Sequence, residues 1–444
     1  MLIRAVCAAE LGDQIDRLAQ PYVDSETVVG MTVGVVKGDQ RLVRGYGQLS
    51  AGDPRAPDGR TIYELGSVSK VFTGLLLADA VIAKRVTLDT PAEDLLPSGV
   101  TMQRRDEKLP ILLRHLATHC SGLPRLPDNL EPADPENPYA DYDGKRLAAF
   151  LKSFRPRKRP GEVGEYSNLG VGLLGDLLAF QSKTSYESLL KSRITEPLGL
   201  ADTTITLSDE QQKRLAPPHT EGGARGHTWD FDKLAGCGAI RGTADDLLKF
   251  ARANMHPPEG PMGEAIELAW RVHQEPIGEG DFPMGLCWHV ARDGATRWHN
   301  GQTGGYHTAV FINRPLDAAV VVLTNTSTDE VDQLAGDLIR MLAGADVKPR
   351  EFEEVLHVPA DVMKRYAGRY QFAPGLVLTV SVEGNKLLAG LTGQQTVRVY
   401  PRTETEWYYK IVEATLTFQV NPRGRCTAVE LFQNGVRQTA KRVR

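Results

Sequence analysis

Cysteine is scarce in this sequence of 444 residues. The five cysteines are Cys7, Cys120, Cys237, Cys287 and Cys426. Their number is odd, their positions are scattered and no Cys-x-x-Cys pair occurs, so neither a disulfide framework nor a zinc site is expected. Most of these side chains should instead be buried as small hydrophobic groups.

The sequence also lacks a strong excess of charge of either sign. Its formal net charge is −4, and 24% of its residues are charged. A nucleic acid is therefore not expected as a partner. The basic cluster at 155–159 is interrupted by Pro156 and followed by Pro160 and Gly161. That pattern favours a solvated turn over a site for a polyanion.

Long hydrophobic runs are absent as well. The longest apolar run, near residues 71–83, contains Asp79 and is too short to span a bilayer. Residues 1–9 are too few and too interrupted to form a complete secretory signal. We therefore expect a cytoplasmic protein without a membrane partner. A leader lost from the sequence would place the protein in the periplasm or outside the cell.

The composition that is present, 41% hydrophobic residues, predicts a large core and a second domain. Residues 10–23 have helical periodicity, and residues 30–36 and 41–47 form a predicted hairpin around the turn 37–40. An apolar helix follows Ser69. A helix, a hairpin and a buried helix in this order favour an antiparallel sheet flanked by helices over parallel βαβ units.

The rest of the first 345 residues continues this mixed pattern. Residues 125–143 are rich in Pro, Asp and Glu and predict a long surface loop of the kind that often forms a lid. Further elements are predicted as helices over 111–119, 145–154, from 171 onward and 329–343, and as strands over 284–290, 295–298, 310–312 and 319–323. Thr243 begins a pattern close to a capping box.

After about residue 345 the pattern changes to short strands separated by turn signals such as residues 383–385 and Asn434-Gly435. The predicted strands are 367–371, 376–382, 386–391, 395–400, 405–412, 414–420, 426–432 and 436–442. This spacing indicates a small all-β barrel or sandwich. We therefore expect two domains, 1–345 and 346–444. A stabilising, a dimerising and a gating role all fit the second one.

Ser67 and Lys70 form a Ser-x-x-Lys motif at the start of the apolar helix, directly after Gly66. Residues three apart share a helix face, so the amine can reach the hydroxyl. The amide of Ser67 would lie at the positive end of the helix dipole, where an oxyanion is favoured. The same spacing recurs at Ser188 and Lys191, but that copy lies inside an amphipathic pattern and is interpreted as solvated.

Two further patterns are weak by themselves. Tyr166 and Asn168 lie in a turn before a helix, where they either face one cleft or serve as a packed aromatic and an N-cap. His299 and Gly301 lie at a strand edge, where the glycine allows close backbone approach and the histidine can equally have only a local partner.

The histidines His115 and His119 are four residues apart, as in a metal-binding helix. Leu116 stands where zinc peptidases carry their catalytic Glu, so no metal is predicted there. No other cofactor is implied.

The Ser-x-x-Lys, Tyr-x-Asn and His-x-Gly patterns occur in that order, and the last two occur once each in the chain. In this order and context they resemble the serine β-lactamase and penicillin-binding protein superfamily, closest to its class C β-lactamase-like branch. The resemblance covers about residues 10–345 and includes the segments 116–124, 196–200 and 285–288. It implies an α+β fold, in which a helical subdomain accompanies the antiparallel sheet.

The resemblance also implies a role for each matching residue. Ser67 would be the acylated nucleophile, with Lys70 as its general base or as the group that lowers the pKa of Tyr166. Tyr166 would carry a proton from Ser67 to the leaving group and later activate water. Asn168 would hold Lys70 and the substrate's acyl amide. Gly301 lies on the edge strand, and Gln302 after it would share the oxyanion hole with the Ser67 amide.

His299 departs from the family pattern. β-lactamases and DD-peptidases typically carry Lys-Thr-Gly here, and the lysine helps to bind a substrate carboxylate. A largely neutral histidine should bind a carboxylate more weakly. His-x-Gly at this place resembles D-aminopeptidases and esterase-like members such as the family VIII carboxylesterases.

The leading hypothesis is a serine hydrolase that forms an acyl-enzyme with small esters or amides, most simply a carboxylesterase with weak β-lactamase activity. The alternatives are a D-amino-acid-specific peptidase, either an aminopeptidase or a DD-carboxypeptidase, and a protein that binds penicillin or peptidoglycan without turnover. In each case the partner is a small ester, amide or β-lactam. The sequence does not indicate an oligomeric state.

Overall fold

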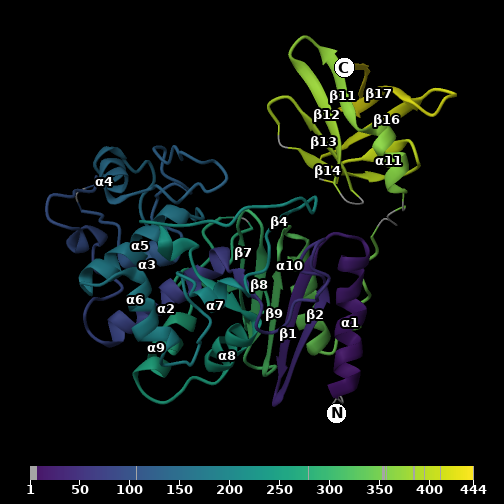
Figure 1. The fold of residues 1–444 in the computed structure, drawn as a ribbon. Helices are drawn as coiled ribbons and strands as arrows, with labels where there is room; N and C mark the ends of the chain where they lie inside the picture. Colours follow the sequence, from purple (N-terminus) through teal and green to yellow (C-terminus); the bar gives the residue numbers. More distant parts are fainter. Residues whose placement is uncertain are drawn as a thin grey trace.

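A six-stranded antiparallel sheet forms the centre of the first part of the chain (Figure 1). The structure, a computed structural model, describes residues 8–106, 108–278, 280–352, 356, 358–383, 386–394, 396–410 and 412–443. The sheet order is β2-β1-β9-β8-β7-β6. Its strands are β1 (Gly30–Lys37), β2 (Gln40–Gly47), β6 (His289–Val290), β7 (Thr296–Gln302), β8 (His307–Asn313) and β9 (Ala318–Thr324). The predicted N-terminal hairpin therefore pairs with strands from the far end of the domain.

The two faces of this sheet bury two different cores. Alternate residues of β9 point to opposite faces: Val320 and Val322 join one core, and Val321 and Leu323 join the other. Helices α1 (Ala8–Asp24) and α10 (Glu330–Leu342) cover the first face, as Figure 1 shows. On the second face lie α2 (Ser69–Ile82) and α8 (Ala244–Met255). All seven β9 residues are buried, which explains their continuous hydrophobic run.

The remaining helices of the first part gather on the α2 side of the sheet (Figure 1). They are α3 (Leu113–Ala117), α4 (Gly144–Ser153), α5 (Asn168–Gln181), α6 (Tyr186–Leu190), α7 (Asp209–Gln212) and α9 (Pro261–Trp270). Two small sheets complete this part: β3 (Ile62–Glu64) with β5 (Arg241–Thr243), and β4 (His219–Thr220) with β10 (Thr326–Ser327).

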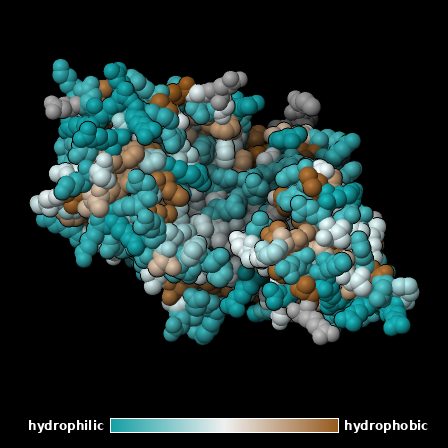
Figure 2. All heavy atoms as spheres, turned by 90° about the horizontal axis from the view of Figure 1, so that it is seen from above, coloured by the Kyte–Doolittle hydropathy of each residue, from teal (hydrophilic) through white to brown (hydrophobic). Residues whose placement is uncertain are grey.

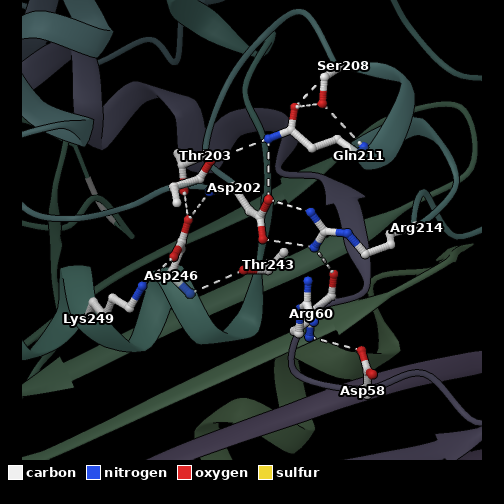
Figure 3. A network of polar contacts seen from close by, with 11 residues as sticks. Asp58, Arg60, Asp202, Thr203, Ser208, Gln211, Arg214, Thr243, Asp246 and Lys249 are labelled. Carbon is white, nitrogen blue, oxygen red and sulfur yellow. Dashed lines mark hydrogen bonds and ion pairs between the residues drawn. The ribbon is translucent and has the colours of Figure 1, made fainter.

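A polar network joins the start of α8 to the segments before α7 and β3 (Figure 3). The Thr243 hydroxyl accepts the N–H of Asp246 at 3.2 Å, which is one half of the predicted capping box. The Asp246 carboxylate instead accepts the N–H of Asp202 at 2.7 Å. Arg214 donates to Asp202 and to the carbonyl of Arg60, both at 2.8 Å. The network therefore fixes the approach to β3, the strand that leads into Ser67.

The C-terminal part is a closed barrel of eight strands. They are β11 (Gly368–Ala373), β12 (Leu376–Glu383), β13 (Lys386–Leu391), β14 (Val397–Pro401), β15 (Glu406–Tyr408), β16 (Ala414–Val420), β17 (Cys426–Gln433) and β18 (Val436–Val443). Helix α11 (Ala360–Tyr366) adds Met363 and Tyr366 to the barrel core. The predicted fold class is confirmed, with a barrel rather than a sandwich. The domain boundary at residue 345 stays a prediction.

Several predicted elements have different bounds. The helix predicted over 111–119 is confined to α3, because His115 binds the Leu112 N–H and His119 adopts a φ of 56°. The strand predicted over 284–290 is only β6, since Cys287 has a φ of 62°. The strand predicted over 295–298 continues to Gln302 in β7.

The loop predicted over 125–143 contains neither helix nor strand, but it is more than a surface loop. Tyr139 and Tyr142 are buried, and the Tyr139 ring stacks on Phe231 at 4.6 Å. The four cysteines that the structure describes are free and buried, as predicted. Cys7, residues 1–7 of the segment judged too short for a secretory signal, and two residues of the predicted turn 383–385 lie outside the described residues.

None of the helices in the described part of the chain has both the length and the apolar character needed to cross a bilayer. On the face seen in Figure 2, hydrophilic side chains predominate, and hydrophobic ones form small separate patches. The described residues of this face therefore offer no broad apolar surface that would mark a partner site.

Candidate active site

The three predicted motifs meet at one cleft of about 860 Å³. Five of the predicted site residues line it: Ser67, Tyr166, Asn168, Gly301 and Gln302. Lys70 and His299 are fully buried beside the cleft. The structure thus brings residues from positions 67 to 302 of the chain to one place.

Ser67 lies in a short 3₁₀ turn, Gly66–Val68, that runs directly into α2. Lys70 follows in the first turn of that helix, and its amine donates to the Ser67 Oγ at 2.8 Å and to the Cys237 carbonyl at 2.7 Å. Because the Lys70 side chain has an exposed fraction of 0%, water does not compete for these contacts. The second Ser-x-x-Lys copy differs, since Ser188 is exposed and accepts from Ser185 instead.

Tyr166 is surrounded by cations and imidazoles. The Lys70 amine lies 4.9 Å from the centre of its ring, and the Arg125 guanidinium lies 5.1 Å from it. The His119 ring packs on the tyrosine at 4.4 Å between centroids. These contacts place the Tyr166 ring next to Lys70, the group with which it would exchange a proton.

Asn168 does not make the contact with Lys70 that the family resemblance implies. Its side-chain amide donates to the Tyr139 hydroxyl at 3.0 Å, and its Oδ1 has no hydrogen-bond partner among the described residues. The Cys237 carbonyl occupies the place next to the Lys70 amine instead. Asn168 nevertheless lines the cleft.

Two glycines let strand β7, which lies next to the short edge strand β6, approach the Ser67 turn. A Cβ on Gly301 would lie 2.6 Å from the Ser67 amide nitrogen and 2.2 Å from the Leu65 carbonyl. A Cβ on Gly66 would lie 2.7 Å from the Gln302 nitrogen, and Gly66 itself has a φ of 50°. The Thr308 hydroxyl on the neighbouring strand β8 donates to the Leu65 carbonyl at 2.8 Å and so holds the Ser67 turn on the sheet. The Ser67 and Gln302 amides, the predicted oxyanion hole, therefore lie at one junction.

His299 lies beneath the cleft in a group of imidazoles. Its ring is 5.0 Å from that of His289 and 6.3 Å from that of Tyr166. Its Nδ1–H donates to the Asn300 carbonyl at 2.6 Å, which leaves Nε2 as an unprotonated, unpaired nitrogen among the described residues. Burial, followed by the nearby His289 and Lys70, holds the pKa of His299 well below its usual value. The ring is thus neutral at pH 7.

The neighbouring histidines share this behaviour. Burial and the Lys70 charge lower the pKa of His289 to about 4, and they hold that of His119 well below its usual value. The described residues contain no cluster of His, Cys, Asp and Glu able to bind a metal ion. The imidazoles therefore form a neutral group beside the Lys70 amine.

Neutral histidines in the fold predict a loss of stability in acid. An unfolded histidine takes up its proton near pH 6.5, whereas folded His289 does so near 4. The neutral ring therefore makes its full contribution to the free energy of unfolding above about pH 6.5. That contribution declines as the pH falls towards 4. We expect the thermal midpoint of wild type to fall over this window, and that of His289→Phe to fall less steeply.

The matched control is Phe282→Leu, which alters the packing around the same imidazole without removing it, since the two rings lie 6.3 Å apart. This variant should keep the wild-type slope of midpoint against pH. Identical slopes for wild type and His289→Phe would contradict the assignment of a neutral, desolvated ring.

Sequence reasoning missed several groups in this site. The Cys237 carbonyl and Arg125 carry no local signal, because only the fold brings them to Lys70 and Tyr166. His119 was considered only as a metal ligand, and His289 was not considered. The family segment 116–124, which contains His119, was the signal available in the sequence.

Comparison with known proteins shows to which family the chain belongs. The sequence model of the Beta-lactamase family matches residues 15–344. The chain belongs to the beta-lactamase family. It is accordingly a serine hydrolase of the serine β-lactamase and penicillin-binding protein superfamily, as predicted. A second model, described as a Domain of unknown function (DUF3471), matches residues 354–441, the barrel region.

Curated relatives of this family member carry different names. A "Beta-lactamase" of Escherichia coli is 27% identical over 300 residues, which cover 65% of this chain and 74% of that protein. A "D-alanyl-D-alanine-carboxypeptidase/endopeptidase AmpH" of the same species is 30% identical over 54% of this chain and 60% of its own. "Penicillin-binding protein 4*" of Bacillus subtilis is 22% identical over 94% of this chain and 95% of its own.

Solved structures agree on the fold. A "Beta-lactamase/D-alanine Carboxypeptidase from Yersinia pestis" covers 77% of this chain and 100% of its own with a TM-score of 0.65 and 24% identity. A "class C beta lactamase" has the same coverage, a TM-score of 0.66 and 20% identity. At these identities the likeness establishes the β-lactamase fold and leaves the substrate open.

Proposed function

We propose that this beta-lactamase family member is a carboxylesterase that acts on small neutral esters and amides and has weak β-lactamase activity. The observation that carries the proposal is the buried, neutral His299 at the position where the family typically has a lysine. Without that cation, the site loses a recognition element for the carboxylate of β-lactams and of D-Ala-D-Ala termini.

The contacts of Ser67 support acyl transfer. In the proposed reaction its Oγ attacks the substrate carbonyl carbon while its proton passes to Lys70 or Tyr166, and the Ser67 and Gln302 amides bind the resulting oxyanion. The leaving alcohol or amine takes up the proton as the bond to it breaks. Water then attacks the acyl-enzyme, releases the acid and restores Ser67. Lys70 is placed for the first step, because its amine lies 2.8 Å from the Oγ.

The charge of the cleft wall supports the same substrate class. The described residues that line the cleft include four carboxylates and one guanidinium. These are Glu136, Glu221, Asp329 and Asp332, and Arg125. Burial and the nearby carboxylates of Asp329 and Glu330 raise the pKa of Glu221. Such a wall repels an anionic substrate and tolerates a neutral or cationic one.

The same wall favours one second candidate, a D-amino-acid-specific aminopeptidase. The substrate of such an enzyme carries a free ammonium group, which the wall carboxylates would attract.

A substrate panel tests the proposal. It consists of a short-chain p-nitrophenyl ester, the same ester with a terminal carboxylate, nitrocefin, D-Ala-p-nitroanilide and a D-Ala-D-Ala peptide. We expect the neutral ester to have the highest kcat/KM, about tenfold above its carboxylate analogue. This ratio should decrease with added salt, because salt screens the charges of the cleft carboxylates. Faster turnover of nitrocefin or of the D-Ala-D-Ala peptide would overturn the proposal, and faster turnover of D-Ala-p-nitroanilide would support the second candidate.

A further inference from the structure

A tight turn at residues 220–224 lies between the cleft and the barrel. The Thr220 N–H donates to the Ala224 carbonyl, and the Gly223 N–H donates to the Thr220 carbonyl, both at 2.8 Å. The turn follows β4, which pairs with β10 next to the active-site strands. Figure 1 shows the chain after β4 reaching the lower end of the barrel, near β14. We call this segment the 220–224 turn.

The first half of the turn belongs to the cleft. Thr220 and Glu221 line the same cavity as Ser67. The turn is also connected to the oxyanion strand through β10, because the Ser327 hydroxyl accepts from the Gln302 side chain at 2.9 Å and donates to the Thr303 carbonyl at 2.8 Å. A shift of the turn would therefore reshape one wall of the substrate site.

The second half of the turn belongs to the barrel interface. The Lys386 amine at the start of β13 donates to the Gly223 carbonyl at 2.9 Å. Gly222 packs directly on β14, since a Cβ there would lie 2.8 Å from the Arg398 backbone nitrogen. Gly223 has a φ of 70°, a backbone conformation that suits glycine. Barrel and turn are thus in contact through backbone on both sides.

The barrel is in turn held on the sheet domain by polar contacts near the end of α1. Arg398, which is buried, pairs with Glu26, and the Lys410 amine donates to the Ser25 carbonyl at 3.1 Å. Burial and the neighbouring Arg398 lower the pKa of Lys386, which is half-buried, to about 8. These contacts fix the barrel on the sheet domain, so that it can hold the 220–224 turn in place.

We propose that the barrel is a positioning domain for the cleft wall: Lys386 and the β14 backbone hold Gly222 and Gly223, and thereby fix Thr220 and Glu221 against the substrate. This assigns to the Domain of unknown function (DUF3471) region a role in specificity instead of catalysis. The consequence is selective. Substrates that extend to the wall depend on the barrel contacts, whereas a minimal ester that occupies only the space around Ser67 does not.

Variants at the contact test this role in the full chain. Lys386→Met removes the donor to the turn, Gly222→Ala places a methyl group against the β14 backbone, and Lys386→Arg restores a donor. The matched control is Lys441→Met, which makes the same substitution at an exposed lysine of barrel strand β18. Active sites are counted by labelling with a fluorophosphonate, so that rates refer to folded enzyme.

Two measurements are made on each variant. In kinetics with p-nitrophenyl acetate and p-nitrophenyl octanoate, Lys386→Met and Gly222→Ala should lower kcat/KM about tenfold for the octanoate, mainly through KM, and change it less than twofold for the acetate. In hydrogen exchange, amides of the 220–224 turn should exchange at least tenfold faster. Lys386→Arg and Lys441→Met should resemble wild type in both.

An octanoate-to-acetate ratio equal to that of wild type in both contact variants would overturn the inference. Equal losses for the two esters would also overturn it, because they would show a general stabilising role. Unchanged exchange of the turn amides would overturn it independently of any substrate. The exchange measurement therefore decides the inference even where the proposed esterase function fails.

Discussion

Ser67→Ala is expected to reduce ester hydrolysis by a factor on the order of 10⁴ to 10⁶ while leaving the fold intact. The Ser67 Oγ accepts from the Lys70 amine at 2.8 Å, and the replacement removes only this oxygen from a turn whose backbone contacts remain. The measurement is kcat/KM for p-nitrophenyl acetate, together with the thermal midpoint as a check on folding.

The chain supplies a matched control in its second Ser-x-x-Lys copy. Ser188→Ala makes the same substitution at the same motif spacing, but in an exposed helix position. We expect it to keep full activity. Hydrolysis that survives Ser67→Ala, or that is lost in Ser188→Ala, would show that the nucleophile has been assigned to the wrong residue.

Gly301→Ala should lower kcat/KM by about 10²-fold or more, the loss typical of an oxyanion donor. The added methyl group would lie 2.6 Å from the Ser67 amide nitrogen and 2.2 Å from the Leu65 carbonyl, and real Cβ atoms do not approach backbone so closely. Either β7 or the Ser67 turn must move, which separates the two amides. Because the change acts on the transition state, kcat should fall more than KM rises.

Gly336→Ala is the control for this substitution, since a Cβ at that α10 position meets no atom within 4 Å. It should retain wild-type kinetics. Wild-type kcat in Gly301→Ala would show that the close approach of β7 to Ser67 is not needed for oxyanion stabilisation.

The sequence predicted those features whose signals are local. The N-terminal hairpin follows from alternating strands around the turn 37–40, and the eight barrel strands follow from regularly spaced turn signals. The Ser67 turn was recognisable because a glycine, the motif and an apolar helix adjoin in the chain. Order and context then joined the three motifs into one site.

Features made by distant residues could not be predicted in this way. Asn168 was expected to hold Lys70, but the fold places the Cys237 carbonyl beside that amine. A sequence motif cannot indicate this contact, because every residue has a backbone oxygen. His299 was expected to be largely neutral, but the sequence could not show why its pKa is lowered further, because only the fold buries the ring fully next to His289. The contact of Lys386 with Gly223 joins two parts of the chain that were predicted as separate domains.

The most direct test of Ser67 as the nucleophile is the site of labelling by a fluorophosphonate, which transfers its phosphonyl group to an activated serine and releases fluoride. Intact mass followed by fragmentation of the tryptic peptide 61–70 distinguishes Ser67 from Ser69. We predict one adduct per chain, located on Ser67 and prevented by a competing ester substrate. A chain that stays unlabelled, or an adduct on Ser69, Ser188 or another residue, would contradict the account.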